Sequence, residues 1–148
     1  MPAADGSKRA DLGGFRMEIP QGWQSVRPPL PKIMWMMRTE AGYAIDITRE
    51  AHAGDLAAYD SLSNHEERSA GIQEVGRRNA RLLGVKALEI DLQFPLGYGG
   101  HRSVVLEAVK GGEAFVLSCS APPAEIEAAR ALCHRLAKTL EVLPLTSP

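Results

Sequence analysis

This 148-residue sequence has little net charge, no long apolar run and few cysteines, and each of these features argues against a class of function. The formal net charge is only −1, from 17 basic and 18 acidic side chains, so no overall field attracts nucleic acid or an anionic membrane. No apolar run is long enough to span a bilayer, and the first fourteen residues are unlike a secretory signal. The two cysteines suit neither a disulfide framework nor a metal motif. We therefore expect a cytoplasmic protein that binds no nucleic acid and does not insert into a membrane.

The chain length suits one domain with a single sizeable core. Residues 1–14 lack periodicity and are predicted to form a flexible N-terminal arm, which leaves residues 15–148 as the domain. A proline-rich stretch at residues 25–32 is interpreted either as a rigid connector or as a polyproline ligand.

Alternation of apolar and polar side chains predicts strands at residues 15–19, 33–38 and 43–50, the last two joined by a loop containing glycine. Another strand is predicted at residues 87–94. A hairpin with a Gly-Gly turn is predicted over residues 101–120.

Two helices are predicted. The first has Asp55 as its N-cap and an apolar stripe formed by Leu56, Tyr59 and Leu62, so that it should lie on a sheet with its other side in water. Residues 73–83 carry a weak signal and are predicted as a loop leading to an exposed strand. The second helix follows two prolines, and its buried stripe comprises Ile126, Ala129, Leu132, Cys133, Leu136 and Leu140.

The predicted strands are clustered and do not alternate singly with helices, a pattern typical of an α+β domain. We expect an antiparallel sheet of about six strands with two main helices packed on it. A doubly wound nucleotide-binding fold is disfavoured.

No set of residues identifies a reaction. His65 lacks the second histidine of a zinc-binding helix, because Ser69 stands in its place. Cys133 and His134 are neighbours on a helix and point about 100° apart, so one cannot readily activate the other. Cys119 and Cys133 could meet as a contact or as a disulfide. We expect no catalytic residues, no metal site and no cofactor, and an enzyme that uses a cysteine remains an alternative.

The methionine-rich strand at residues 33–38 is one candidate partner-binding surface. Alternation places Met37 inward with Ile33 and Trp35, whereas Met34 and Met36 share the face flanked by charged residues. Thioethers suit surfaces that accept varied apolar shapes. Burial beneath a covering helix is the alternative for these two methionines.

Charge marks a second candidate surface. Arg77, Arg78 and Arg81 gather near Lys86 and could hold phosphate or an acidic partner, and a solvated strand face is the alternative. The glycine-rich loop around Tyr98 lies between predicted strands, so it does not suit a phosphate-binding loop. The candidate partner-binding residues are Met34, Met36, Tyr98, Arg77 and Arg81.

Several short motifs occur in a familiar order: "FRMEIPQGWQ", "AGYAIDITRE" before a helix, "LLGVKALEIDLQF", and "RSVVLEAVKGGEAFVLSCSAP" before a final helix. This order, over residues 15–143, resembles the PsbP-like superfamily. That superfamily includes Ran-binding Mog-type proteins, bacterial DcrB-like lipoproteins and Eag-type chaperones of type VI secretion.

The resemblance implies an antiparallel sheet with packed helices and a non-catalytic binding module. In the Eag-type branch, such a module is a dimeric, cytosolic chaperone or adaptor for an apolar helical segment of a secreted effector. The lipoprotein branch fits poorly, because the first cysteine is Cys119. The common family ending, a helix and a serine-phenylalanine pair, is replaced here by "KTLEVL". The alternative is a regulatory domain for charge-led docking or small-ligand binding, which would use the Tyr98 loop and the arginines.

Overall fold

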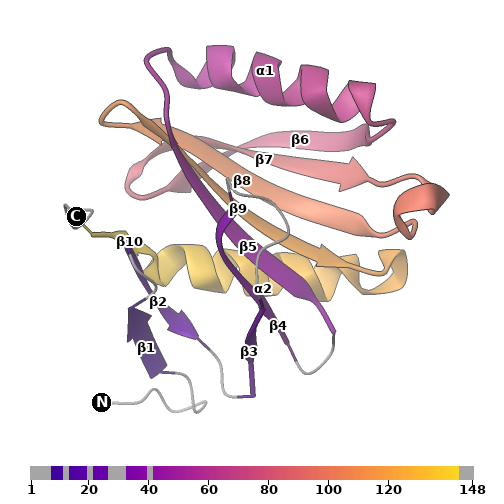
Figure 1. Cartoon of the computed structure of the whole chain (residues 1–148), viewed down its shortest axis with the longest axis horizontal. Helices are drawn as coiled ribbons and strands as arrows, with labels where there is room; N and C mark the ends of the chain where they lie inside the picture. Colours follow the sequence, from indigo (N-terminus) through magenta and orange to yellow (C-terminus); the bar gives the residue numbers. More distant parts are fainter. Residues whose placement is uncertain (1–7, 12–13, 20–21, 27–32, 40–41, 144–148) are drawn as a thin grey trace.

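A seven-stranded antiparallel sheet forms the centre of the molecule, with one helix over each face (Figure 1). The computed structural model describes residues 8–11, 14–19, 22–26, 33–39 and 42–143. The strand order in the large sheet is β3-β4-β5-β9-β8-β7-β6, and β1, β2 and β10 form a second sheet. This arrangement confirms the predicted α+β class and adds strands to the six that were expected.

The elements of the large sheet are β3 (Gln24–Val26), β4 (Ile33–Arg38), β5 (Ala44–Ala51), β6 (Gln73–Leu82), β7 (Val85–Gln93), β8 (Arg102–Lys110) and β9 (Glu113–Ala121). The small sheet comprises β1 (Lys8–Asp11), β2 (Phe15–Ile19) and β10 (Glu141–Val142). The helices are α1 (Leu56–Ser69) and α2 (Ile126–Thr139), and two 3-10 turns cover Leu96–Tyr98 (η1) and Pro123–Glu125 (η2).

The small sheet corrects the expectation of an arm that extends through residue 14. Residues 8–11 form β1 and pair antiparallel with β2, which also pairs with β10. Arg49 of β5 ties this sheet to the large one, because its guanidinium donates to the carbonyl oxygens of Gly14 and Leu143. The same guanidinium lies over the rings of Phe15 and Phe115.

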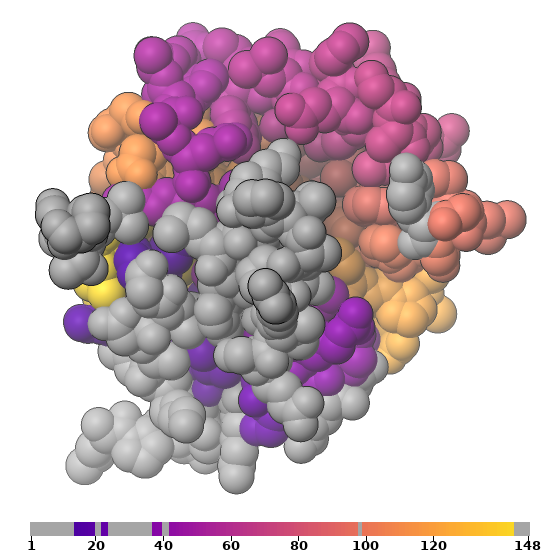
Figure 2. All heavy atoms as spheres, viewed as in Figure 1, coloured from indigo at the N-terminus to yellow at the C-terminus, as the bar shows by residue number. Residues whose placement is uncertain are grey.

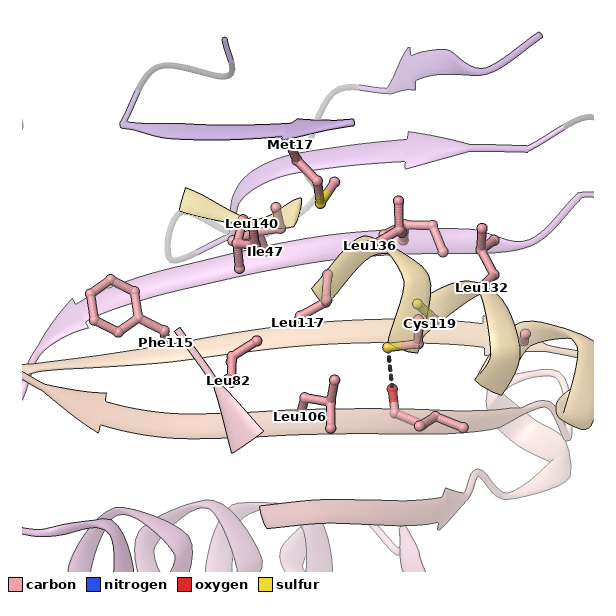
Figure 3. Packing of buried hydrophobic residues seen from close by; sticks show 14 of the residues in the cluster. Met17, Ile47, Leu82, Leu106, Phe115, Leu117, Cys119, Leu132, Leu136 and Leu140 are labelled. Carbon is pink, nitrogen blue, oxygen red and sulfur yellow. Dashed lines mark hydrogen bonds between the residues drawn. The ribbon is translucent and has the colours of Figure 1, made fainter. Parts of the chain in front are cut away.

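The buried stripe predicted for α2 is confirmed at all six positions. These side chains pack against β8, β9 and β2 in the main core, where Met17, Leu117 and Leu136 are fully enclosed (Figure 3). Cys133 packs there too, with its Sγ 4.0 Å from the carbonyl oxygen of Val104. Met37 is buried as predicted.

Helix α1 lies on the opposite face of the sheet, with its outer side exposed along the top of the molecule in Figure 2. Asp55 caps it as predicted, accepting a hydrogen bond from the Ala58 amide at 2.9 Å. The predicted stripe is wrong at Leu62, which is 59% exposed, whereas Tyr59 is buried. None of the described helices is long and apolar enough to cross a membrane.

Strand β6 replaces most of the loop that was predicted for residues 73–83. Its ten residues pair antiparallel with β7 along the whole length, with one irregularity between Glu74 and Gly76. The apolar alternation that marks other strands is absent because most of β6 is exposed. The loop prediction was therefore wrong, and the prediction of an exposed strand here was right.

Candidate functional site

A pocket of about 1080 Å³ lies on the α2 side of the large sheet. Its walls are β6, the turns that close the β6–β7 and β8–β9 hairpins, the C-terminal half of α2, and β10. A pocket of this size is comparable to those that bind small ligands or the side chains of a partner protein.

The inner surface of the pocket is apolar. Leu82, Leu106 and Phe115 belong to strands β6, β8 and β9, and they lie close together in the core beneath the pocket (Figure 3). Ala80 and Ala137 add small side chains from β6 and α2, and Leu140 and Val142 complete the lining. Because the side chains of Ala80 and Ala137 are small, these two positions leave space in the pocket between β6 and α2.

The β6–β7 turn at the mouth of the pocket contains a backbone conformation that side chains rarely adopt. Leu83 has φ 55° and is followed by Gly84 at φ 76°. The leucine side chain nevertheless packs against the core and lines the pocket. A non-glycine residue held at positive φ is a feature often found at functional sites.

Three cations at the rim of the pocket have no carboxylate partner among the described residues. Arg81 donates to the Gly84 carbonyl oxygen at 2.8 Å, and Lys110 donates to the Leu83 carbonyl oxygen at 2.9 Å. Lys138 of α2 is exposed and forms no ion pair in the described part of the chain. The rim therefore offers positive charge to an anionic or acidic group.

The acidic residues at the pocket are already engaged. Glu113 forms a two-contact ion pair with Arg49, at 2.6 and 2.9 Å. Glu141 lies within 3.9 Å of Arg16. Glu89 is 2% exposed and is contacted by a cluster of basic side chains from β6 and α2.

This buried cluster joins β7 to α2 at one end of the pocket. Arg130 contacts both Glu89 and Asp91 at 2.7 Å, while Arg78 and His134 contact Glu89 from β6 and α2. Burial alone would raise the pKa of Asp91, but hydrogen bonds from Arg130 and Arg78 outweigh it and lower the pKa to about 2. The pKa of Glu89 is lowered in the same way, with His134 contributing. The cluster is a structural link whose carboxylates remain charged.

A third buried carboxyl group, that of Glu107, lies on the α1 side of the sheet and does not line the pocket. Glu107 of β8 is 2% exposed and hydrogen-bonds to Asp60 of α1. Burial, followed by the contact with Asp60, raises the pKa of Glu107 to about 9, so its carboxyl is protonated at neutral pH. Glu67 of α1 has a pKa raised to about 7, chiefly by burial and by Asp60.

Solved structures of other proteins share this architecture. Cyanobacterial PsbP (CyanoP) from Synechocystis sp. PCC 6803 matches with a TM-score of 0.67 at 12% identity, covering 95% of each chain. The chain therefore has a PsbP-like fold. LpqN, which is involved in cell envelope biogenesis of Mycobacterium tuberculosis, matches with a TM-score of 0.58 at 15% identity, covering 93% of this chain and 91% of its own.

PA94 from Pseudomonas aeruginosa, a candidate regulator, shares the PsbP-like fold with a TM-score of 0.55 at 15% identity, covering 95% of this chain and 99% of its own. Comparison with protein-family models and with curated proteins gave no significant match. The structural likeness establishes the fold, whereas a relationship to the Ran-binding Mog-type or Eag-type branch remains a prediction.

The PsbP-like fold separates the arginines that the sequence placed together. Arg77 points to the α1 side, where it contacts Asp60 at 2.9 Å and Glu74 at 2.7 Å. Arg78 points to the opposite face, and Arg81 lies at the pocket rim. A single phosphate-binding group formed by all three arginines is therefore wrong. The partner-binding role of Arg77 and Arg81 remains a prediction.

The other predicted site residues belong to elements that contribute no described residue to the pocket lining. Met34 and Met36 belong to β4, with Met36 paired to Asp46 of β5, and Tyr98 ends the η1 turn. The side chains of all three lie outside the described part of the structure. Their role in partner binding remains a prediction.

Sequence reasoning missed the pocket and both buried carboxyl clusters. The charges of Glu89 and Asp91 alternate with leucine and isoleucine, a pattern that indicates a solvent-facing strand side. In the structure α2 covers that side and supplies Arg130. A usable signal existed for Glu107, because a lone acid within an otherwise apolar strand indicates a buried carboxyl.

Proposed function

We propose that this domain is a non-catalytic binding module that holds an apolar segment of a partner protein in the pocket between β6 and α2. The observation that carries the proposal is the 1080 Å³ pocket with its apolar lining. Burial of a partner's apolar side chains there would supply about 25 cal/mol for each Å² removed from water. The finer proposal is a cytoplasmic adaptor or chaperone, for which the partner is a secreted effector.

The absence of catalysis is part of the same proposal. The pocket carboxylates Glu89, Glu113 and Glu141 each lie within ion-pair distance of an arginine, and the imidazole of His134 contacts Glu89. The two cysteines are buried in the core, and burial raises the pKa of the Cys119 thiol. A thiol of this kind favours packing over nucleophilic attack.

Two matched substitutions on α2 test the proposal. Ala137→Phe places a large ring in the pocket, whereas Ala131→Phe makes the same change at an exposed position of the helix. All three proteins are immobilised and exposed to an extract of the native host, after thermal melting has shown that each is folded. We expect the unmodified protein and Ala131→Phe to retain the same partner, and Ala137→Phe to lose it. Equal retention by Ala137→Phe would exclude the pocket as the binding site.

A small amphiphilic ligand with an anionic head is the second candidate. It is favoured by the three rim cations, which surround an apolar interior of ligand size. The mass of the bound species distinguishes the two candidates. Native mass spectrometry of the protein isolated from its host should show a bound protein chain if the apolar segment is the ligand, and a bound small molecule if the alternative is right.

A further inference from the structure

Strand β6 is an edge of the large sheet, and no strand among the described residues pairs with its outer side. It pairs with β7 on one side and is the last strand in the order, and seven of its ten residues are exposed. An edge strand of this length presents a row of backbone donors and acceptors that another chain can pair with. The opposite edge strand, β3, has only three residues.

The β6–β7 turn determines which backbone groups are open. Leu83 and Gly84 both have positive φ and form a two-residue turn between the paired residues Leu82 and Val85. In such a hairpin the pair that flanks the turn exchanges both hydrogen bonds, and the pattern alternates along the ladder. The backbone groups of Arg81 and Asn79 therefore point away from β7, toward the open edge.

The open edge and the pocket form one continuous surface. Every residue from Arg78 to Gly84 lines the pocket. Side chains of successive strand residues point to opposite faces, so a consecutive run can line one pocket only if the strand's edge forms part of the wall. Asn79 and Arg81 thus border the pocket at the positions where their backbone groups are open.

The positive charge around the pocket indicates the chemistry of a segment that would pair with β6. Arg81, Lys110 and Lys138 surround the pocket without carboxylate partners among the described residues. A second copy of this chain that paired through its own β6 would bring arginine-rich strands together, and like charges oppose such pairing. An acidic segment would instead find complementary charge.

We infer that β6 accepts an extended acidic segment of the partner as an added strand, with alternate apolar side chains of that segment entering the pocket. This inference rests on the proposed function and specifies the conformation and charge of the bound segment. Hydrogen bonds to the backbone of Asn79 and Arg81 hold the segment, and the pocket selects its apolar side chains.

Labelled peptides test the inference by fluorescence anisotropy with the whole protein. The first probe alternates valine and glutamate over about ten residues, the length of β6. The second has the same sequence with N-methylated amides at alternate residues, and the third carries lysine in place of glutamate. We expect the first to bind, and the other two to bind at least about tenfold more weakly, because each lacks either the backbone donors or the complementary charge.

Two proline variants in β6, one beside the pocket and one away from it, locate the contact. Asn79→Pro removes an outward N–H and keeps the β6–β7 ladder, because the ladder does not use that group. We expect it to melt within a few degrees of the unmodified protein and to bind the first peptide about fivefold more weakly, the effect of one hydrogen bond. Glu74→Pro near the far end of β6 is the control, because Glu74 lies opposite Leu92, also has an outward N–H and does not line the pocket; it should leave binding unchanged.

The outcomes separate this inference from the proposed function. If Ala137→Phe abolishes binding but Asn79→Pro and N-methylation have no effect, the pocket is the site and strand addition is wrong. If neither Ala137→Phe nor Asn79→Pro changes binding, both proposals are wrong. Failure of the acidic peptide to bind at millimolar concentration would overturn the inferred charge and conformation of the segment.

Discussion

The carboxyl group of Glu107 is enclosed between β8 and α1, where burial and Asp60 raise its pKa to about 9. An unfolded glutamate has a pKa near 4.5, so between these two values the folded state binds more protons than the unfolded state. The contribution of Glu107 to the free energy of unfolding therefore falls as pH rises from about 5 to 9. One proton gives a slope on the order of 1 kcal/mol per pH unit.

Replacing Glu107 with glutamine should flatten this dependence, because the amide donates to Asp60 as the protonated carboxyl does and cannot ionise. We expect Glu107→Gln to unfold in urea with a free energy that varies less between pH 7 and 9 than that of the unmodified protein. Glu67, whose pKa is raised to about 7, contributes in the same direction at lower pH and is unchanged in this variant. An equally steep slope in both proteins would show that Glu107 is ionised in the folded state.

The pH dependence of stability contributed by Asp91 has the opposite sign, because its pKa of about 2 in the folded state lies below its unfolded value of 3.8. Its contribution to stability is present above pH 4 and is lost as the pH falls toward 2. Arg130→Met removes the main partner of Asp91 and one partner of Glu89, and leaves two buried carboxylates with fewer cationic partners. We expect a loss of roughly 3 kcal/mol at pH 7 and a much smaller loss at pH 3, measured by urea unfolding.

Lys138→Met on the same helix provides the control for Arg130→Met, because Lys138 is exposed and contacts no described carboxylate. It should change the free energy of unfolding by less than about 0.5 kcal/mol. A similar loss in both variants at pH 7 would contradict the linking role of the buried cluster.

At the scale of elements, the start of α1 depends on a local hydrogen bond. Asp55 accepts from the Ala58 amide at 2.9 Å, and the buried contacts of α1 include Tyr59, whose hydroxyl donates to Glu50 at 2.8 Å. We expect Asp55→Ala to lower the free energy of unfolding by about 1 kcal/mol, and Asp55→Asn to retain most of it, because asparagine also caps helices. Urea unfolding measures both, and equal losses would mean that the cap hydrogen bond contributes nothing.

The elements that could be predicted are those in which the pattern of apolar and polar side chains indicates the buried face. Helix α2 has a regular apolar stripe, and all six predicted positions are buried. Strand β6 could not be predicted in full, because an exposed edge strand has no apolar face to repeat. The small sheet was missed for another reason: β10 has only two residues, and its pairing with β2 is made across nearly the whole chain.

At the scale of the whole molecule, the sequence predicted the PsbP-like fold but not the place where the molecule presents a binding surface. The pocket is bordered by β6, two hairpin turns and the end of α2, which lie far apart in the sequence. Its interior depends on small residues such as Ala80 and Ala137, which carry no signal of their own. Of the predicted site residues whose side chains the structure describes, Arg77 lies on the α1 side and Arg81 lies on the pocket rim.

Hydrogen–deuterium exchange of the protein with and without its captured partner tests most directly whether the pocket is the binding site. We predict slower amide exchange in β6 and in the C-terminal half of α2, with no change in β4 or in the turn at Tyr98. Protection confined to β4, where Met34 and Met36 lie, would contradict the account and would place the partner on the methionine-rich strand.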